Sequence, residues 1–281
     1  MNIFAFLPAW PMGSMQMTRV MGLLAFVLIA NSSAHAAIYG ADQRRDISNT
    51  GKRWQQAAQG VAVVLPTFWL LDLDQDHYYH EEHQDRSYSE TVGICKDEKF
   101  ANQKSFGHCS AFLVAPNIVI SAGHCFLPKG KVEDEAHSYC ENFSFWFGYN
   151  TANNPLDLLG SVIPKRDVAH CKRVIYAENN DQTEPEENPI DFAIYELQAP
   201  VEHIEPLRVS LKTLSKGQSV ATIGHPHGLP AKFSGLSPLL KNYKTTLSSF
   251  FFFLFGNSGG TAFNGNGEVV GILVSCHQHD T

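Results

Sequence analysis

The sequence predicts an all-β protein, either a sandwich or a barrel, and three observations carry that prediction. Short runs rich in β-branched and aromatic residues recur along the chain. Gly, Pro, Asn and Asp separate these runs. Long amphipathic helices are hard to find. The expected strands are Val61–Leu65, Ser110–Val114, Ile118–Ser121, Phe143–Phe147, Phe192–Leu197, Val220–Ile223 and Val269–Val274.

Turn signals support several of these strands. Ala115-Pro116-Asn117 separates two expected strands, and Asn264-Gly265-Asn266-Gly267 is a strong hairpin signal before the last one. Two polar segments, Asp72–Asp85 and Glu178–Pro189, cannot be buried cheaply. We expect both of them to be loops.

Composition and charge narrow the class of protein. The 281 residues are 44% hydrophobic and 17% charged, which is ordinary for a chain that buries a core and too apolar for a mainly disordered one. The formal net charge of -7 does not favour a surface that binds polyanions. Nucleic acid is therefore not an expected partner.

Residues 1–36 are typical of a signal peptide. Arg19 is the one charged residue there, Val20–Ala30 is an unbroken apolar run, and Ala34-His35-Ala36 fits a cleavage site. The run is too short to span a bilayer, which takes about 20 apolar residues, and a buried core helix is the weaker alternative. We expect a secreted or periplasmic protein that leaves the membrane after cleavage.

Six cysteines follow the expected cleavage site. An oxidising compartment makes disulfides the default interpretation, although many pairings stay open. Cys109 precedes one expected hairpin, and Cys125 follows it, directly after His124. A Cys109–Cys125 bridge would close a loop of about 16 residues, worth about 3 kcal/mol in the chain-entropy model, and is the pairing that we favour first. It would hold the histidine turn against the hairpin.

Three residues suited to acyl transfer occur in order along the chain. His124 follows the small-residue turn Ser121-Ala122-Gly123. Asp191 stands at the head of an apolar strand, where a buried carboxylate needs a partner such as a histidine N–H. Ser258 lies among three glycines in Gly256–Gly260, which permit a tight turn with inward-pointing N–H groups able to stabilise an oxyanion.

The ordered set of Ser-Ala-Gly-His-Cys, Ile-Asp-Phe-Ala-Ile and Gly-Asn-Ser-Gly-Gly resembles the chymotrypsin-like, or trypsin-like, serine proteases. The resemblance is closest to secreted bacterial members, including the glutamyl-endopeptidase-like branch. Further matches include Ile38-Tyr39-Gly40 and Gly224-His225-Pro226. The resemblance covers most of residues 38–276 and implies two antiparallel β-barrels with the active site between them.

The resemblance also implies a role for each residue. His124 would be the general base, Asp191 its orienting carboxylate and Ser258 the nucleophile of a serine endopeptidase. Backbone N–H groups of Gly256 and Ser258 would form the oxyanion hole. We expect a peptide or protein substrate, no cofactor, no metal and a monomer. The alternative is a catalytically silent homologue that acts as a secreted binding protein.

Three features depart from the family pattern. Asn257 stands where many zymogen-activated relatives carry an Asp that pairs with the freed N-terminal amine, so that route of activation is not expected. Phe252 argues against Arg or Lys specificity, and no histidine supports Glu specificity on the strand that ends in Leu273-Val274-Ser275. The run Phe250–Phe255 has three interpretations: a buried strand, a pocket wall or a sequence anomaly.

Other candidate sites are weaker. His77, His80 and His83 have a spacing that can bind a transition metal, but a solvated loop is the better interpretation. Cys140 and Cys171 are expected to pair. Cys95 and Cys276 would then be bonded to each other or free.

The resemblance divides the chain into residues 37–205, an N-terminal barrel carrying His124 and Asp191, and residues 206–281, a C-terminal barrel carrying Ser258. Relatives have a longer segment after the nucleophile, so we expect an incomplete C-terminal barrel. An open sheet edge near Val269–Cys276 and marginal stability would follow.

Overall fold

The structure is a computed structural model that describes residues 42–80, 87–127, 140–152, 162–179, 190–243, 246–249 and 256–274. The predicted signal peptide, the Phe250–Phe255 run, His83, Cys276 and most of the acidic segment up to Pro189 lie outside these residues. Strands dominate the described part of the chain, which confirms the all-β class. The boundaries expected at residues 36 and 205 stay predictions.

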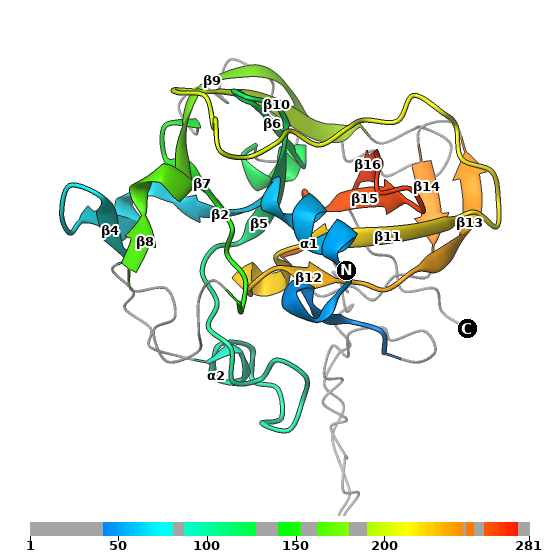
Figure 1. Ribbon diagram of the computed structural model, residues 1–281, viewed down its shortest axis with the longest axis horizontal. Coiled ribbons are helices and arrows are strands. Elements are labelled where there is room, and N and C mark those ends of the chain that lie inside the picture. The colour runs from blue at the N-terminus through cyan, green and yellow to red at the C-terminus, as the bar shows by residue number, and fades with distance from the viewer. Residues whose placement is uncertain are drawn as a thin grey trace, which may run out of the picture. The chain divides into compact units, whose positions relative to one another are not determined.

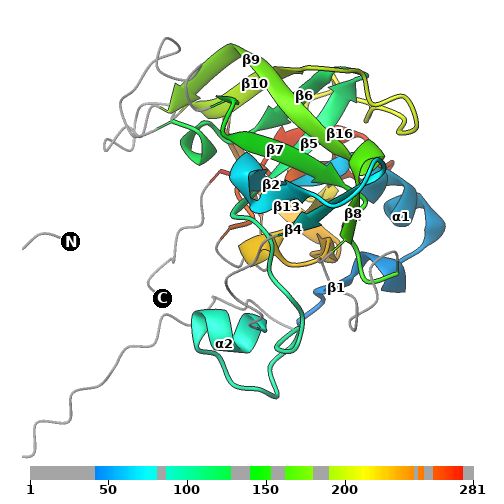
Figure 2. The ribbon, with the colours of Figure 1, turned by 90° about the vertical axis from the view of Figure 1, so that its left-hand side faces the viewer.

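Six antiparallel strands form a closed barrel, and Figures 1 and 2 show them from two sides. The strand order around the ring is β10-β6-β5-β2-β7-β9. The bounds are β2 (Val61–Pro66), β5 (Cys109–Ala115), β6 (Ile118–Ser121), β7 (Phe143–Phe147), β9 (Val168–Asn179) and β10 (Asp191–Leu197). β10 closes the ring because it pairs with β6 on one side and with β9 on the other.

Strand β2 is an unbroken apolar run because both of its faces are buried. Ala62 and Val64 belong to the hydrophobic cluster inside the barrel, together with buried residues of the other five strands. Val63 and Leu65 pack in a second cluster with Trp146. A strand that is buried on both faces has no position for the polar half of an alternating pattern.

A second sheet lies beside the barrel and contains the strands near Ser258. Its main path is β1-β12-β11-β13-β14, and β15 pairs with β11 and with β16. The bounds are β1 (Arg45–Asp46), β11 (Ser219–Gly224), β12 (Lys232–Phe233), β13 (Ser237–Tyr243), β14 (Thr246–Ser249), β15 (Thr261–Asn264) and β16 (Val269–Ile272).

The outer edge of β16 was expected to be open. Within the described residues β16 pairs as a strand with β15 only. Its first residue is nevertheless covered on the other side, because the backbone of Val269 exchanges hydrogen bonds of 2.8 Å with Arg208 and Ser210. The pairings of this sheet do not close into a ring over the described part of the chain.

A hairpin occupies part of the polar segment that we expected to be a loop, so that prediction was wrong there. β3 (Leu70–Asp72) pairs with β4 (His77–His80), and β4 pairs with β8 (Val162–Pro164). The register places Leu70 opposite His80. Burial explains the error, because the side chain of His80 is only 3% exposed and packs between Trp69 and Phe106.

Two α-helices accompany the strands in the described residues: α1 (Lys52–Gln59) and α2 (Tyr88–Val92). Trp54 of α1 packs against Phe233 and Phe263, so this helix covers the second sheet. Both views show α2 set apart from the barrel strands. Short 3-10 helices are η1 (Ile47–Asn49), η2 (Thr67–Trp69), η3 (Gly123–Cys125), η5 (Lys165–Asp167) and η6 (Pro226–Gly228).

Candidate active site

His124 lies in the short helix η3, directly after β6. The residue before it, Gly123, has to be glycine. A Cβ added to Gly123 would lie 2.0 Å from the carbonyl oxygen of Glu178 and 3.1 Å from Oδ1 of Asp191. The turn therefore presses against the ends of β9 and β10, and only glycine allows that approach.

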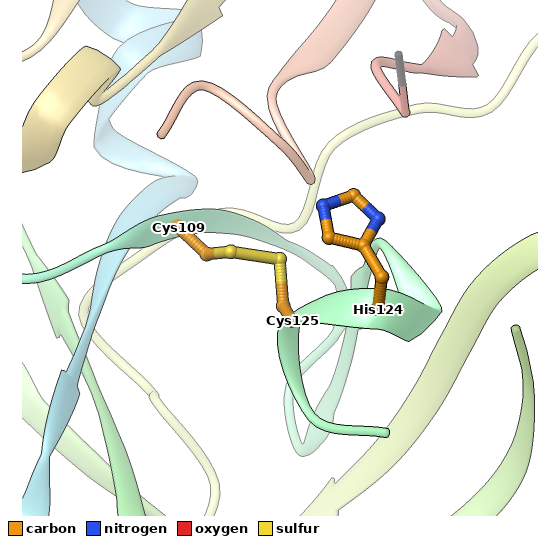
Figure 3. A group of neighbouring side chains, drawn as sticks. All are labelled: Cys109, His124 and Cys125. Atoms are coloured by element: carbon orange, nitrogen blue, oxygen red, sulfur yellow. A yellow bond between two sulfur atoms is a disulfide. The ribbon is translucent and has the colours of Figure 1, made fainter. Parts of the chain in front are cut away.

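A disulfide fixes this turn to strand β5. Cys109 and Cys125 are bonded, with an S–S distance of 2.01 Å and a Cα–Cα distance of 6.2 Å. Figure 3 shows the imidazole of His124 beside this bridge. A second disulfide joins Cys140 to Cys171. Cys95 is exposed and has a free thiol.

Asp191 begins β10 and contacts His124 at two points. Its Oδ2 lies 2.6 Å from Nδ1 of the imidazole, and its Oδ1 accepts a 2.9 Å hydrogen bond from the backbone N–H of His124. The carboxylate side chain is 14% exposed and the imidazole is 35% exposed. The carboxylate thus fixes the ring and the backbone together, and it leaves Nε2 as the nitrogen that can accept a proton.

Ser258 lies in the glycine-rich turn before β15, next to the histidine turn. Its carbonyl oxygen accepts a 2.7 Å hydrogen bond from the N–H of Ser110 and lies 3.8 Å from Sγ of Cys125. Among the contacts of the described residues there is no hydrogen bond between Ser258 Oγ and His124.

The glycines around Ser258 meet a steric demand. Gly256 and Gly259 have positive φ values of +77° and +80°. A Cβ on Gly259 would lie 1.9 Å from the carbonyl oxygen of Ser110. The turn is therefore pressed against β5 at a distance that no side chain permits.

Asn257 is 7% exposed, and its Oδ1 has no hydrogen-bond partner in the described part of the protein. A Cβ on Gly224 would lie 2.2 Å from this oxygen, so the amide fills the space beside Gly224. The side chain is uncharged, as the sequence requires. We predicted that activation does not use an ion pair between residue 257 and the freed N-terminal amine. This stays a prediction.

His108 is a second imidazole near His124, which the sequence analysis did not single out. Burial lowers the pKa of His108, and the neighbouring His124 lowers it further. The ring packs against Phe143, with 5.1 Å between the ring centroids. A hydrogen bond with the backbone of Cys125 acts in the opposite direction and raises the pKa, but the net shift of the His108 pKa is downward.

The structure gives no support for a metal site among the described residues. Cys109, His124 and Cys125 are the one group there with ligand atoms close enough together, within 4.8 Å of one another. Both sulfurs are consumed by the disulfide, whereas a metal needs thiolates. His77 binds Asp74 at the hairpin tip, while His80 is buried among aromatic rings, so these two histidines do not form a site.

The sequence analysis matched Gly224-His225-Pro226 to the family but did not predict that the turn at Pro226–Gly228 packs against the serine loop. A Cβ on Gly256 would lie 2.7 Å from the backbone nitrogen of His227. The sequence around it, Gly-His-Pro-His-Gly, was the available signal. Separately, the described residues include no helix that is long and apolar enough to cross a membrane.

Comparisons with known proteins bear on the family and the fold. The family model described as a trypsin-like peptidase domain matches residues 109–272, a range that contains His124, Asp191 and Ser258. No curated protein matches the chain. A solved structure of a Glu endopeptidase in complex with MPD superposes with a TM-score of 0.51 at 12% sequence identity, over 86% of this chain and 88% of that one. At that identity the likeness establishes the chymotrypsin-like fold alone. The family model matches more than half of this chain. The chain therefore belongs to the trypsin-like peptidase family.

Proposed function

We propose that this protein is an exported serine endopeptidase that cleaves peptide bonds with His124, Asp191 and Ser258. The contact of Asp191 with both the imidazole and the backbone of His124 carries the proposal. A carboxylate in that position orients the ring and stabilises the imidazolium that forms during acyl transfer. Membership of the peptidase family supports a peptide or protein as the substrate.

The proposed reaction has two half-steps. Ser258 Oγ attacks the scissile carbonyl carbon while Nε2 of His124 takes the hydroxyl proton. The N–H groups of Gly256 and Ser258 would stabilise the resulting oxyanion. Collapse breaks the C–N bond, and the imidazolium returns the proton to the leaving amine. Water then attacks the acyl-enzyme by the same route and restores Ser258.

Two disulfides support the proposed export, because such bonds form and persist in oxidising compartments. The peptide at residues 1–36 supplies the route in this proposal. The preferred residue before the cleaved bond stays open to experiment, since Phe252 and its neighbours lie outside the described residues. A monomer without cofactor remains the expectation.

A direct test labels the purified protein with a fluorophosphonate and measures hydrolysis of a fluorogenic peptide library. The Ser258→Ala variant should lose labelling and about six orders of magnitude in turnover. The Ser210→Ala variant is the matched control, because Ser210 lies in the segment beside β16 and binds the N–H of Lys212. It should label and hydrolyse like the wild type.

Each other outcome has a distinct meaning. Labelling that survives in Ser258→Ala would assign the nucleophile to another residue. A folded wild-type protein with neither labelling nor hydrolysis would replace the proposal with the catalytically silent homologue. The library also reports the residue preferred before the cut, which tests the expected absence of Arg, Lys or Glu specificity.

A further inference from the structure

We propose that His227 is a positioning residue, which sets the orientation of the Gly256 amide that would stabilise the oxyanion. The inference rests on the proposed function and goes beyond it, because it adds a residue outside the triad. It also assigns a role to the segment around α2, residues 87–106, which we call the α2 segment. This segment would hold the backbone of His227 in place.

Gly256 is enclosed by two backbone segments. A Cβ at Gly256 would lie 2.7 Å from the nitrogen and 2.9 Å from the Cα of His227, and 3.2 Å from the carbonyl oxygen of His108. The Cα of Gly256 therefore packs directly against the backbone of His227. In this proposal, a displacement of His227 changes the space into which Gly256 fits and so displaces its N–H group.

The backbone of His227 is itself in an unusual conformation. Its φ of 51° and ψ of 26° are left-handed, and Gly228 follows with a φ of +70°. Such a conformation is uncommon outside glycine, although Asn, Asp and His adopt it more often than other residues. Strained backbone of this kind persists where the surroundings enforce it and occurs preferentially at functional sites.

Contacts from the α2 segment enforce this conformation. The hydroxyl of Ser105 donates a hydrogen bond to the carbonyl oxygen of His227. The N–H of Phe106 donates to the carbonyl oxygen of Gly228 at 2.7 Å. The ring of Tyr88 packs on the imidazole of His227, with 5.3 Å between the centroids, and Tyr88 is only 2% exposed.

The α2 segment is in turn held in place near Tyr88. The N–H of Tyr88 donates to the carbonyl oxygen of Gln103 at 2.7 Å, and Ser87 and Glu90 form a capping box at the start of α2. A continuous set of contacts thus runs from α2 through His227 to Gly256. A shift of His227 should move the Gly256 amide without touching His124 or Asp191.

A displaced oxyanion donor has a specific kinetic signature. The oxyanion exists only in the transition state and the tetrahedral intermediate, so weakening its stabilisation lowers kcat and leaves KM nearly unchanged. Complete removal of one such donor costs about 10²–10³ in kcat. Misplacement of Gly256 should cost less than that, about tenfold to a hundredfold.

The test compares two substitutions at His227. His227→Val replaces a residue that tolerates the left-handed region with a β-branched one that does not. We expect it to lower kcat by about tenfold to a hundredfold with less than a threefold change in KM. His227→Asn keeps the tolerance for this region but removes the imidazole on which Tyr88 packs, so its kcat should fall by less than that of His227→Val.

Substitutions at Tyr88 address the support from α2, and they decide the matter if His227→Val does not fold. Tyr88→Leu removes the aromatic ring and should lower kcat in the same direction, whereas Tyr88→Phe keeps the ring and the activity. Tyr79→Leu is the matched control, because Tyr79 is 44% exposed on β4 and does not belong to the α2 segment. It should keep the wild-type kcat.

Two further readouts separate positioning from a loss of folded protein. Affinity for a peptide aldehyde, which mimics the tetrahedral intermediate, should fall in parallel with kcat/KM in His227→Val and Tyr88→Leu. The fraction of active sites is titrated with a fluorophosphonate, and rates are given per labelled site. Thermal melts record how much protein is folded at the assay temperature.

The proposal is overturned if folded Tyr88→Leu and every folded His227 variant keep the wild-type kcat and aldehyde affinity. It is also overturned if KM rises while kcat is unchanged, because His227 would then contact substrate instead of positioning Gly256. The wild-type enzyme and Ser258→Ala are assayed alongside. An inactive, unlabelled wild type would refute the proposed function itself, whereas an active wild type with unaffected variants refutes only the role of His227.

Discussion

Asp191 holds His124 by two separate atoms, with Oδ2 at 2.6 Å from the imidazole Nδ1 and Oδ1 at 2.9 Å from the backbone nitrogen. The two residues are 67 positions apart in the chain. Their contact depends on β10 pairing with β6, the strand that ends just before the histidine turn. The geometry of the candidate catalytic pair is therefore a property of barrel closure.

Replacing Asp191 tests this relationship. Asp191→Asn keeps the shape but presents an amide to Nδ1, which favours the wrong tautomer of His124, so kcat should fall by about 10⁴ with the fold retained. Steady-state kinetics and circular dichroism give the two readouts. Asp167→Asn is the control, because Asp167 pairs with the exposed His203 at 3.0 Å and should keep full activity. Similar activity in both variants would argue against a triad.

The Cys109–Cys125 bridge should contribute to stability and to the site together. Replacing both cysteines by alanine should lower the free energy of unfolding by about 3 kcal/mol. Activity per folded molecule should also fall, since Cys125 follows His124 and lies 3.8 Å from the carbonyl oxygen of Ser258. Urea unfolding and active-site titration measure the two effects.

The second disulfide provides the matched control. Alanine at both Cys140 and Cys171 should lower stability while activity per folded molecule stays near that of the wild type. The bridge at Cys109 has no special role at the site if the two double variants lose activity equally.

Buried His80 should make the fold sensitive to acid. Burial lowers its pKa from 6.5 to about 4, so between these values the unfolded chain binds a proton that the folded chain does not. The stabilising contribution is complete above pH 6.5 and is lost as the pH falls towards 4. At pH 5 the loss is about 2 kcal/mol relative to pH 7.

His80→Phe tests that estimate. Neither ring nitrogen of His80 has a hydrogen-bond partner among the described residues, so phenylalanine should fit between Trp69 and Phe106. Urea unfolding at pH 7 and pH 5 should show a pH dependence about 2 kcal/mol smaller in the variant. Tyr79→Phe, an exposed position on the same strand, should keep the wild-type dependence. An unchanged slope in His80→Phe would show that His80 does not carry the effect.

Lys232 and Asp46 form a buried ion pair that joins β12 to β1. Nζ lies 2.7 Å from Oδ1 of Asp46, and the lysine side chain is 5% exposed. Burial lowers the pKa of Lys232 to about 8. Lys232→Met leaves the carboxylate of Asp46 unpaired and should cost about 3–5 kcal/mol in stability.

A double-mutant cycle measures the coupling within this pair. Asp46→Asn combined with Lys232→Met should destabilise by clearly less than the sum of the single changes, because no charge is then left unpaired. Lys172→Met provides the comparison, since Lys172 is 55% exposed in its 2.7 Å pair with Glu196 and should cost less than about 1 kcal/mol. Simple additivity would mean that the two charges act independently.

Several elements of the fold were predictable from local patterns, and others were not. The apolar run of β2 and the hairpin of β5 and β6 occur where the sequence places them. The hairpin at Leu70–His80 was missed, because most of its residues are polar and exposed and only the ring of His80 is buried. Helix α1 was missed as well, since it is short and only Trp54, Ala57 and Ala58 of it are buried.

The same contrast applies to the candidate site. The glycines at 256 and 259 predict a tight turn, since positive φ values favour glycine over every other residue. No local sequence pattern predicts that Gly256 packs against His227. That contact forms only when the turn after β11 meets the serine loop.

The sequence by itself determined which residues can do chemistry and which segments must be buried, because residue type and spacing control backbone freedom and hydrophobic burial. It also identified the small residues that the His124 and Ser258 turns require. The tertiary structure alone decided that Oδ2 of Asp191 meets Nδ1 of His124 and that Asp46 meets Lys232, pairs 67 and 186 positions apart. The first contact depends on the closure of the barrel and the second on the register of β1 with β12 in the other sheet. Both are properties of the whole chain and leave no local pattern.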